Sequence, residues 1–211
     1  MTSNLNLAGG TTVTSADSDV TTNFTLPESS TTGFSDDTKA DGYVYNSGSV
    51  YCGNESPCYS YYSYNAATAG TGASLTDDGV NATGSICPKG WRLPTATTSN
   101  ASATSNNNWE TDDFYNLAIQ YGMATGNYYE NPDNSPTLAS LAGPGTTPGF
   151  LFGGYYYDST FRDGGFVGAY WSSTSSSGIN AYYLVFYSSN VNSTFGYARR
   201  NGFSVRCIFG A

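Results

Sequence analysis

The most informative absence in this 211-residue chain is histidine, which does not occur at all. Without histidine the chain cannot form the Ser-His or Cys-His pairs that activate most nucleophiles, nor the usual histidine-based zinc sites. Pairs of carboxylates can also catalyse reactions, but Asp36–Asp37, Asp77–Asp78 and Asp112–Asp113 are sequence neighbours, whose side chains point apart. We expect these acids to be solvated. The sequence therefore predicts no enzyme, no cofactor and no metal site.

Charged residues are also scarce, at 11% of the chain, and only seven of them are basic, against sixteen acidic ones. The resulting net charge of −9 argues against a nucleic-acid partner, because phosphate binding needs clustered Lys and Arg. Long apolar runs are missing too, so the sequence predicts neither a membrane helix nor a signal peptide. If the protein is exported, we expect its leader or membrane anchor to lie outside this chain.

Cysteine is limited to four residues, namely Cys52, Cys58, Cys87 and Cys207. An even count in an acidic chain rich in Tyr, Ser and Asn indicates an oxidising location, extracellular or on a cell or virion surface. Three disulfide connectivities are possible. We favour Cys52–Cys58, which closes a short loop, together with Cys87–Cys207, which joins the middle of the chain to its C-terminus. The spacing does not fit a CxxC-type metal site.

What the chain does contain is tyrosine, with 19 residues, in a composition that is 16% aromatic. Tyrosine offers a large contact area with few rotatable bonds, and Ser, Gly and Asn add adaptable hydrogen bonds, as in antibody paratopes. This amino-acid composition is typical of an extracellular protein that binds a partner.

The order of patterns along the chain predicts an α+β fold. We expect an extended arm or stalk over residues 1–40 and a globular domain over 41–211. Apolar residues recur every three to four positions over 107–122 and predict a helix there. A second helix is predicted over 135–143, which begins with Ser-Pro, as helix N-termini often do, and ends with Gly. The strand candidates that follow are 149–157, 165–173, 180–187, 191–198 and 202–209.

The strand candidate at 180–187, "NAYYLVFY", is apolar on both faces. Alternation places Tyr182, Leu184 and Phe186 on one face, and Tyr183, Val185 and Tyr187 on the other. A half-buried strand normally alternates apolar with polar residues, so the pattern does not say which face is the core.

Four motifs occur in order, "CPKGWRLPT", "AYWSST", "NAYYLVF" and "NGFSVRCI", within residues 87–208. With them the chain resembles the Fibrobacter succinogenes major paralogous domain, whose relatives include variable proteins of diversity-generating retroelements. The resemblance implies a C-type-lectin-like fold with two helices and a twisted antiparallel sheet. It also implies that the even-numbered residues of 182–186 are core, while Tyr183, Val185 and Tyr187 form an exposed stripe.

In such variable proteins, selected codons near the C-terminus are rewritten. The resemblance implies that the exchanged, ligand-binding residues lie between the motifs: Ile179, Tyr183, Val185, Tyr187, Asn190, Ser193, Thr194, Phe195, Gly196, Tyr197, Ala198 and Arg200. The expected partner is a protein or a surface glycan. Three alternatives remain open: a carbohydrate-binding or adhesin domain of fixed specificity, a structural pilus or surface subunit, and an enzyme using a reactive Cys87 and Cys207.

Overall fold

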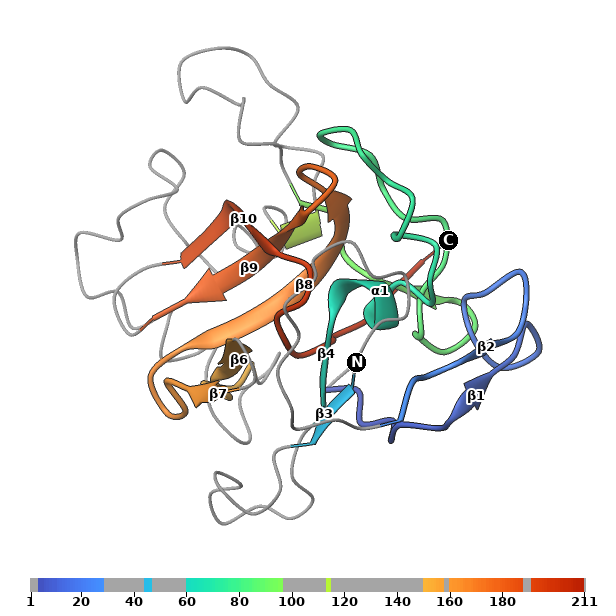
Figure 1. Ribbon diagram of the computed structural model, residues 1–211, viewed down its shortest axis with the longest axis horizontal. Helices are drawn as coiled ribbons and strands as arrows, with labels where there is room; N and C mark the ends of the chain where they lie inside the picture. The colour runs from blue at the N-terminus through green and yellow to red at the C-terminus, as the bar shows by residue number, and fades with distance from the viewer. Residues whose placement is uncertain are drawn as a thin grey trace.

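The computed structural model describes residues 4–28, 44–46, 60–96, 113–114, 150–157, 160–187 and 191–210, with only the backbone described for 44–46 and 191–194. A three-stranded antiparallel sheet dominates this part of the chain, in the order β10-β9-β8 (Figure 1). Its strands are β8 (Gly168–Ser175), β9 (Asn180–Phe186) and β10 (Val191–Ala198). All three coincide with strands that the sequence predicts.

Four small two-stranded sheets surround the central one. They pair β1 (Thr12–Val13) with β2 (Phe24–Thr25), β3 (Val44–Asn46) with β4 (Ser60–Tyr62), β5 (Trp91–Arg92) with β11 (Ile208–Phe209), and β6 (Tyr155–Tyr157) with β7 (Thr160–Arg162). The β5–β11 pair joins the middle of the chain to its C-terminal end. Figure 1 shows the β1–β2 hairpin (blue) on the opposite side of the molecule from β9 and β10.

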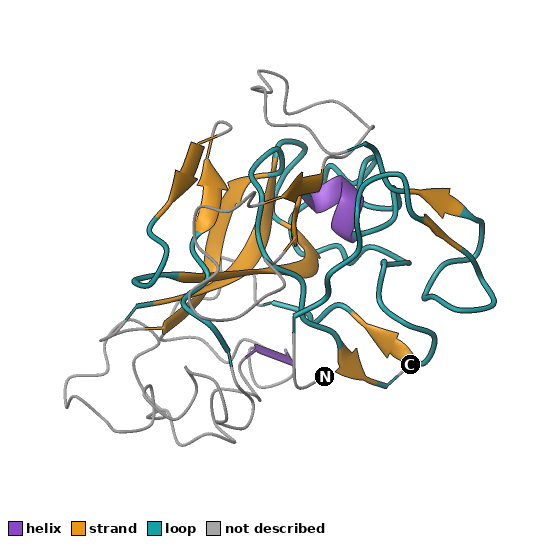
Figure 2. Ribbon diagram, turned by 90° about the horizontal axis from the view of Figure 1, so that it is seen from below, coloured by secondary structure: helices purple, strands orange, loops and turns teal. Residues whose placement is uncertain are grey.

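The prediction of an α+β fold with two helices is wrong. Strands and loops make up nearly all of the described chain, and its one named helix is α1 (Tyr64–Ala67), a single turn (Figure 2). Ser63 caps that turn by accepting a hydrogen bond from the Ala66 backbone N–H. The segments predicted as helices, 107–122 and 135–143, lie outside the described residues except for Asp113 and Phe114, whose backbone is helical.

The physical reason is that the described segments are short aromatic and β-branched runs separated by Gly, Ser, Thr and Asn. Such runs favour strands, while the polar separators hydrogen bond to nearby backbone groups and interrupt helices. Thr68 illustrates this directly after α1, where its hydroxyl donates back to the Tyr64 carbonyl at 2.9 Å. Gly70 then adopts a positive φ of 80°, and the helix does not continue.

Aromatic cores cover both faces of the central sheet. One face, with Trp171 and Tyr183, packs on a cluster that includes Tyr62, Tyr64 and Phe203. The opposite face packs on a second cluster, made of Ala96, Phe114, Phe150, Tyr170, Tyr182, Leu184 and Phe186. A glycine is required at 168, opposite Phe186, because a Cβ there would collide with the Phe186 ring. The sheet is therefore a rigid middle layer.

The first part of the chain belongs to this same core. Leu5 and Leu26 are buried, and the Leu5 N–H donates to the Val205 carbonyl at 2.9 Å. Residues 4–28 are thus packed against the C-terminal half, whereas the predicted boundary between residues 40 and 41 lies outside the described residues.

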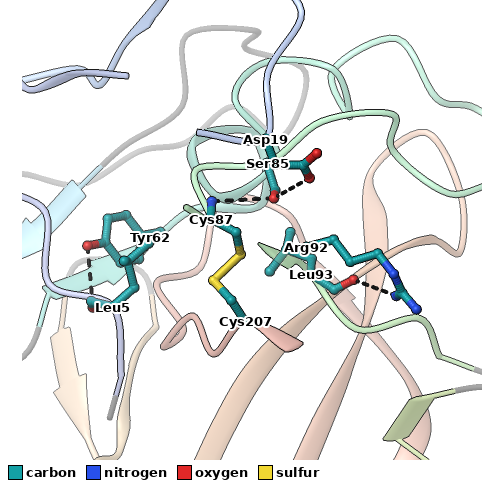
Figure 3. The surroundings of a disulfide bond; sticks show 8 residues. All are labelled: Leu5, Asp19, Tyr62, Ser85, Cys87, Arg92, Leu93 and Cys207. Carbon is teal, nitrogen blue, oxygen red and sulfur yellow. Dashed lines mark hydrogen bonds between the residues drawn. A yellow bond between two sulfur atoms is a disulfide. The ribbon is translucent and has the colours of Figure 1, made fainter. Parts of the chain in front are cut away.

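One of the two favoured disulfides is confirmed. Cys87 and Cys207 are bonded, with their Cα atoms 5.8 Å apart and 120 positions apart in sequence. Figure 3 shows Asp19 and Ser85 above this bond and Arg92 to its right. Cys52 and Cys58 lie outside the described residues.

Candidate ligand-binding surface

The exposed stripe predicted on β9 is wrong for two of its three residues. Tyr183 is only 7% exposed and Val185 only 2% exposed. The chain's own C-terminal segment covers them, since the ring of Phe203 lies 4.7 Å from that of Tyr183. Phe203 is fixed there by two backbone hydrogen bonds with Tyr62, at 2.9 and 3.0 Å. As predicted, Tyr182, Leu184 and Phe186 are core residues, so both faces of β9 are buried.

Exposed aromatic residues occur just beyond β9 and on β10. Tyr187, just beyond β9, is 41% exposed, and Phe195 on β10 is 48% exposed. Phe195 pairs across the sheet with Tyr183, so it lies on the same face but at the β10 margin. Tyr197, two residues further along, is half-buried on that same face.

Five tyrosines gather at this margin, and we call them the tyrosine patch: Tyr155, Tyr157, Tyr183, Tyr187 and Tyr197. The Tyr197 ring is its centre, with centroids 6.5 Å from Tyr155, 6.0 Å from Tyr157 and 5.7 Å from Tyr183. Tyr183 forms the buried floor and Tyr187 the exposed edge. The patch therefore combines rings held in place by packing with rings open to solvent.

The phenol groups of the patch influence one another electrostatically. Burial raises the pKa of Tyr183 well above its usual value, and the neighbouring Tyr187, Tyr197 and Tyr155 raise it further. Burial also raises the pKa of Tyr155 to about 12, assisted by a hydrogen bond to the Asp163 carboxylate. These hydroxyls remain protonated at neutral pH, so they can both donate and accept hydrogen bonds.

The β6–β7 hairpin supplies the part of the patch that sequence reasoning missed. Tyr155 and Tyr157 come from β6, and the Arg162 guanidinium of β7 lies 5.1 Å above the Tyr157 ring centroid. Arg162 and Asp163 are exposed beside the rings. The run "GGYYYDSTFRDGG" was the available signal, because three consecutive tyrosines before a turn place rings on both faces of a hairpin.

The other predicted binding residues are dispersed. Ile179 is 48% exposed, but it lies in the β8–β9 turn, at the opposite end of β9 from Tyr187. Ala198 and Arg200 are half-buried near that same turn, although the charge of Arg200 still acts on Tyr197. A Cβ at Gly196 would collide with the Ser176 side chain. Asn190 lies outside the described residues, as do the side chains of Ser193 and Thr194.

Arg199 fixes the end of β10 from inside the protein. It is 2% exposed, and its guanidinium donates to the carbonyls of Gly72, Leu75, Ser177 and Asn180 and to the Ser175 hydroxyl, at 2.6–3.1 Å. It also stacks over the Tyr64 ring, at 5.0 Å. Burial lowers its pKa, while Tyr64 opposes that change. Arg199 thereby ties the loop at 72–75 to the β8–β9 turn.

Two of the acids expected to be solvated have protein partners instead. Asp113 forms a bidentate ion pair with Arg92, at 2.5 and 3.1 Å, and accepts a hydrogen bond from the Thr95 N–H at 2.7 Å. Burial by itself would raise the pKa of Asp113, but the hydrogen bonds from Arg92 and Thr95 outweigh it and lower the pKa. Asp78 also has a partner, since it accepts a hydrogen bond from the Tyr182 hydroxyl at 2.7 Å.

The tyrosine patch brings together several kinds of chemical group. It offers aromatic faces, phenol hydroxyls, two guanidinium groups and one carboxylate, which suit contact with a partner surface. Within the described ranges, no three His, Cys, Asp or Glu side chains come close enough together to hold a metal ion. A separate search of those ranges for a helix of membrane-spanning length and hydropathy found none.

Comparison with known proteins places the chain in a family. No curated protein and no solved structure matches it. The family model of the Fibrobacter succinogenes major domain matches residues 1–208, a range that includes all four sequence motifs. The chain belongs to the Fibrobacter succinogenes major domain family.

Proposed function

We propose that this protein is a non-enzymatic binding module, displayed outside the cell, that recognises a protein or surface glycan through the tyrosine patch. The observation that supports the proposal best is the placement of half-exposed rings on a rigid margin. Tyr197 is surrounded by rings from β6, from β9 and from the C-terminal segment, where the Phe203 centroid lies 5.8 Å away. Strand β9 beside it is buried on both faces. Aromatic anchors with little freedom to lose are the groups that contribute most to protein interfaces.

The proposal includes exchange of the surface residues by a diversity-generating retroelement, with a narrower set of variable positions than the sequence suggests. Tyr187, Phe195 and Ile179 are exposed and could be exchanged without disturbing the core. Tyr183 and Val185 could not, because any smaller or polar replacement would leave a cavity or an unpaired polar group. The exchanged positions would therefore lie along the β10 margin and at the strand ends.

The charge distribution favours a partner with acidic or hydroxyl groups. The chain has a net charge of −9, yet Arg162 and Arg200 stand beside the rings of the tyrosine patch. These two cations exceed the one carboxylate of the patch, Asp163, so this margin is positive on an acidic protein and favours the approach of a carboxylate or a polyol. The same guanidinium groups can donate hydrogen bonds to carbonyl or hydroxyl oxygens.

Sequencing the gene from many isolates tests this proposal. We expect substitutions to concentrate at Ile179, Tyr187 and Phe195, to match adenines of a nearby template repeat, and to spare Tyr183 and Val185. A reverse transcriptase gene should lie beside the repeat. If these positions are identical in all isolates, and neither a template repeat nor a reverse transcriptase gene lies nearby, the diversification is contradicted. The alternative of an adhesin or carbohydrate-binding domain of fixed specificity would then remain.

A further inference from the structure

A second recessed site shares no lining residue with the tyrosine patch. It is a pocket of about 420 Å³ between the loop at 81–85, strand β5 and the N-terminal segment. Its lining residues include Asp19, Ala82, Ser85, Gly90, Trp91 and Arg92. The volume lies within the range of small-molecule sites, which is roughly 300–1,000 Å³.

The walls of this pocket are held by hydrogen bonds. Ser85 donates twice to Asp19, from its hydroxyl to the carboxylate at 2.8 Å and from its N–H to the backbone carbonyl at 2.7 Å. The Asp19 N–H in turn donates to the carbonyl of Cys87, which the disulfide fixes to Cys207 (Figure 3). Because these contacts join three distant segments, the pocket is formed before any ligand arrives.

Polar groups with spare hydrogen-bonding capacity meet at this site. The Asp19 carboxylate accepts one bond, from Ser85, although a carboxylate has about four acceptor positions. The Arg92 guanidinium makes three bonds, to Leu93 and Asp113, and has five N–H donors. Figure 3 shows the Asp19 and Arg92 side chains extending to the same side of the disulfide.

An aromatic wall completes the site. Trp91 lines the pocket and is half-buried, and the ring of Phe209 stands 5.5 Å from it in an edge-to-face arrangement. Phe209 is 78% exposed, which is unusual for so large an apolar ring. The Trp91 indole lines the same pocket as the Asp19 carboxylate and the Arg92 guanidinium. Such a set suits a ligand that has an apolar C–H face and hydroxyl groups around its edge.

The charges exclude the competing ligand classes. Arg92 is neutralised by the ion pair with Asp113, and Asp19 adds a negative charge, so a phosphate or other anion would be repelled. A lipid chain would cover the remaining acceptor positions of Asp19 and the remaining N–H donors of Arg92 with hydrocarbon, which offers them no hydrogen bonds and is costly. A neutral polyol satisfies the spare donors and acceptors without changing the charge of the pocket.

We propose that this pocket binds a neutral sugar ring, with Trp91 against its C–H face and Asp19 and Arg92 hydrogen bonded to its hydroxyls. The site is independent of the tyrosine patch and consists of residues outside the tract that the proposed function allows to vary. A fixed sugar site and an exchangeable protein or glycan site would then coexist on one chain.

Nuclear magnetic resonance titration of the whole chain tests the inference. The probes are the methyl glycosides of glucose, galactose, mannose and N-acetylglucosamine, each added to about 50 mM, since single sugar rings bind with Kd values on the order of 1 mM. We expect at least one of them to shift the Trp91 indole N–H signal and the amide signals of Asp19, Ser85 and Gly90, with saturation.

Two variants and a control make the result specific. We expect Asp19→Asn, which keeps an acceptor for Ser85, to weaken binding about tenfold, or about 1.4 kcal/mol. We expect Ala82→Leu, which fills the pocket, to abolish it. The control is Asp77→Asn, which removes the same charge at an exposed residue. The one hydrogen bond described for the Asp77 side chain is a 3.4 Å contact with Thr76, so this variant should leave the Kd for the sugar unchanged.

The inference is overturned if none of the four glycosides shifts these signals, or if Asp19→Asn and Asp77→Asn bind equally well. Shifts confined to Tyr155, Tyr187 and Tyr197 would also overturn it, and would instead support glycan binding at the tyrosine patch. Conversely, a saturable shift at Trp91 would stand even if the C-terminal tract proved invariant among isolates, so the two proposals fail separately.

Discussion

The contrast between Tyr183 and Tyr187 gives the most direct test of how this molecule divides its C-terminal tract between core and surface. Both are tyrosines, four residues apart, and both belong to the stripe that the sequence assigned to the ligand. Tyr183 is 7% exposed and Tyr187 is 41% exposed. Replacing each by alanine removes the same atoms from two different environments.

The expected magnitudes follow from the contacts. The Tyr183 ring packs on Phe203, Tyr197 and Trp171, with centroids 4.7, 5.7 and 6.3 Å away, so Tyr183→Ala leaves a cavity in the larger core cluster. Removing a buried aromatic ring costs about 3–5 kcal/mol. A substitution at an exposed position costs within about 0.5 kcal/mol, so Tyr187→Ala should be nearly neutral.

Thermal unfolding followed by calorimetry measures the difference. For a chain of this size, 1 kcal/mol corresponds to about 2–4 °C in Tm, so Tyr183→Ala should lower Tm by roughly 6–20 °C and Tyr187→Ala by at most about 2 °C. Tyr183→Phe is a further control, because it keeps the ring and should retain most of the stability. Equal losses in the two alanine variants would refute the placement of Tyr183 in the core.

Three further predictions concern the contacts that hold the sheet and its flanking segments. Replacing Cys87 and Cys207 together by serine should lower the free energy of unfolding by about 4–5 kcal/mol in the chain-entropy model, measured in urea against the oxidised protein. Arg199→Met keeps the volume but removes five hydrogen bonds from a charged group and leaves the Leu75 carbonyl without its described partner, so it should cost at least about 3 kcal/mol. Methionine at an exposed arginine such as Arg162 should cost little. Because the folded-state pKa of Asp113 is lowered, its contribution to the free energy of unfolding is present above the unfolded pKa of about 4 and is lost as pH falls through the folded value. Urea unfolding between pH 6 and 2 should therefore show a smaller acid-induced loss of stability in Asp113→Asn than in the wild type. Equal pH profiles would contradict the role of the ion pair.

The strands of the C-terminal half could be predicted from sequence because their signal is local. Aromatic and β-branched residues fill β8, β9 and β10, and Gly, Ser and Asn separate them. The Cys87–Cys207 bond could be favoured because, once Cys52 and Cys58 close a short loop, the remaining pair joins the middle of the chain to its C-terminus. These predictions needed only composition and order along the chain.

The burial of both faces of β9 could not be predicted from the sequence, and the reason is physical. Alternation tells which side chains share a face, but it does not tell what covers that face. Both faces of 181–186 are apolar, and both turn out to be covered, one by Phe203 and Tyr64 and the other by Phe150 and Phe114. The covering residues lie far away in sequence, so no local pattern reveals them.

Small elements escaped prediction because they lack a periodic signal. Helix α1 has four residues, too few for an apolar face to repeat, and its helical turn depends on the Ser63 cap. The N-terminal segment similarly carries isolated apolar residues, Leu5, Val13 and Leu26, each buried by distant neighbours. The β6–β7 contribution to the tyrosine patch was missed because Tyr155 and Tyr157 lie outside the tract that the family resemblance singled out.

The position of β10 would allow the proposed exchange of its residues without endangering the fold. Among the described residues β10 is an edge strand of the central sheet, since β9 is its one partner in the order β10-β9-β8. An exposed edge invites pairing with other chains, and exchange toward apolar residues would increase that risk. The register shift between Asn192 and Phe195 interrupts the ladder in the middle of this edge. Such a bulge bends the strand and removes the flat template that another strand would need, so β10 can vary its outward side chains while its backbone stays a poor partner for aggregation.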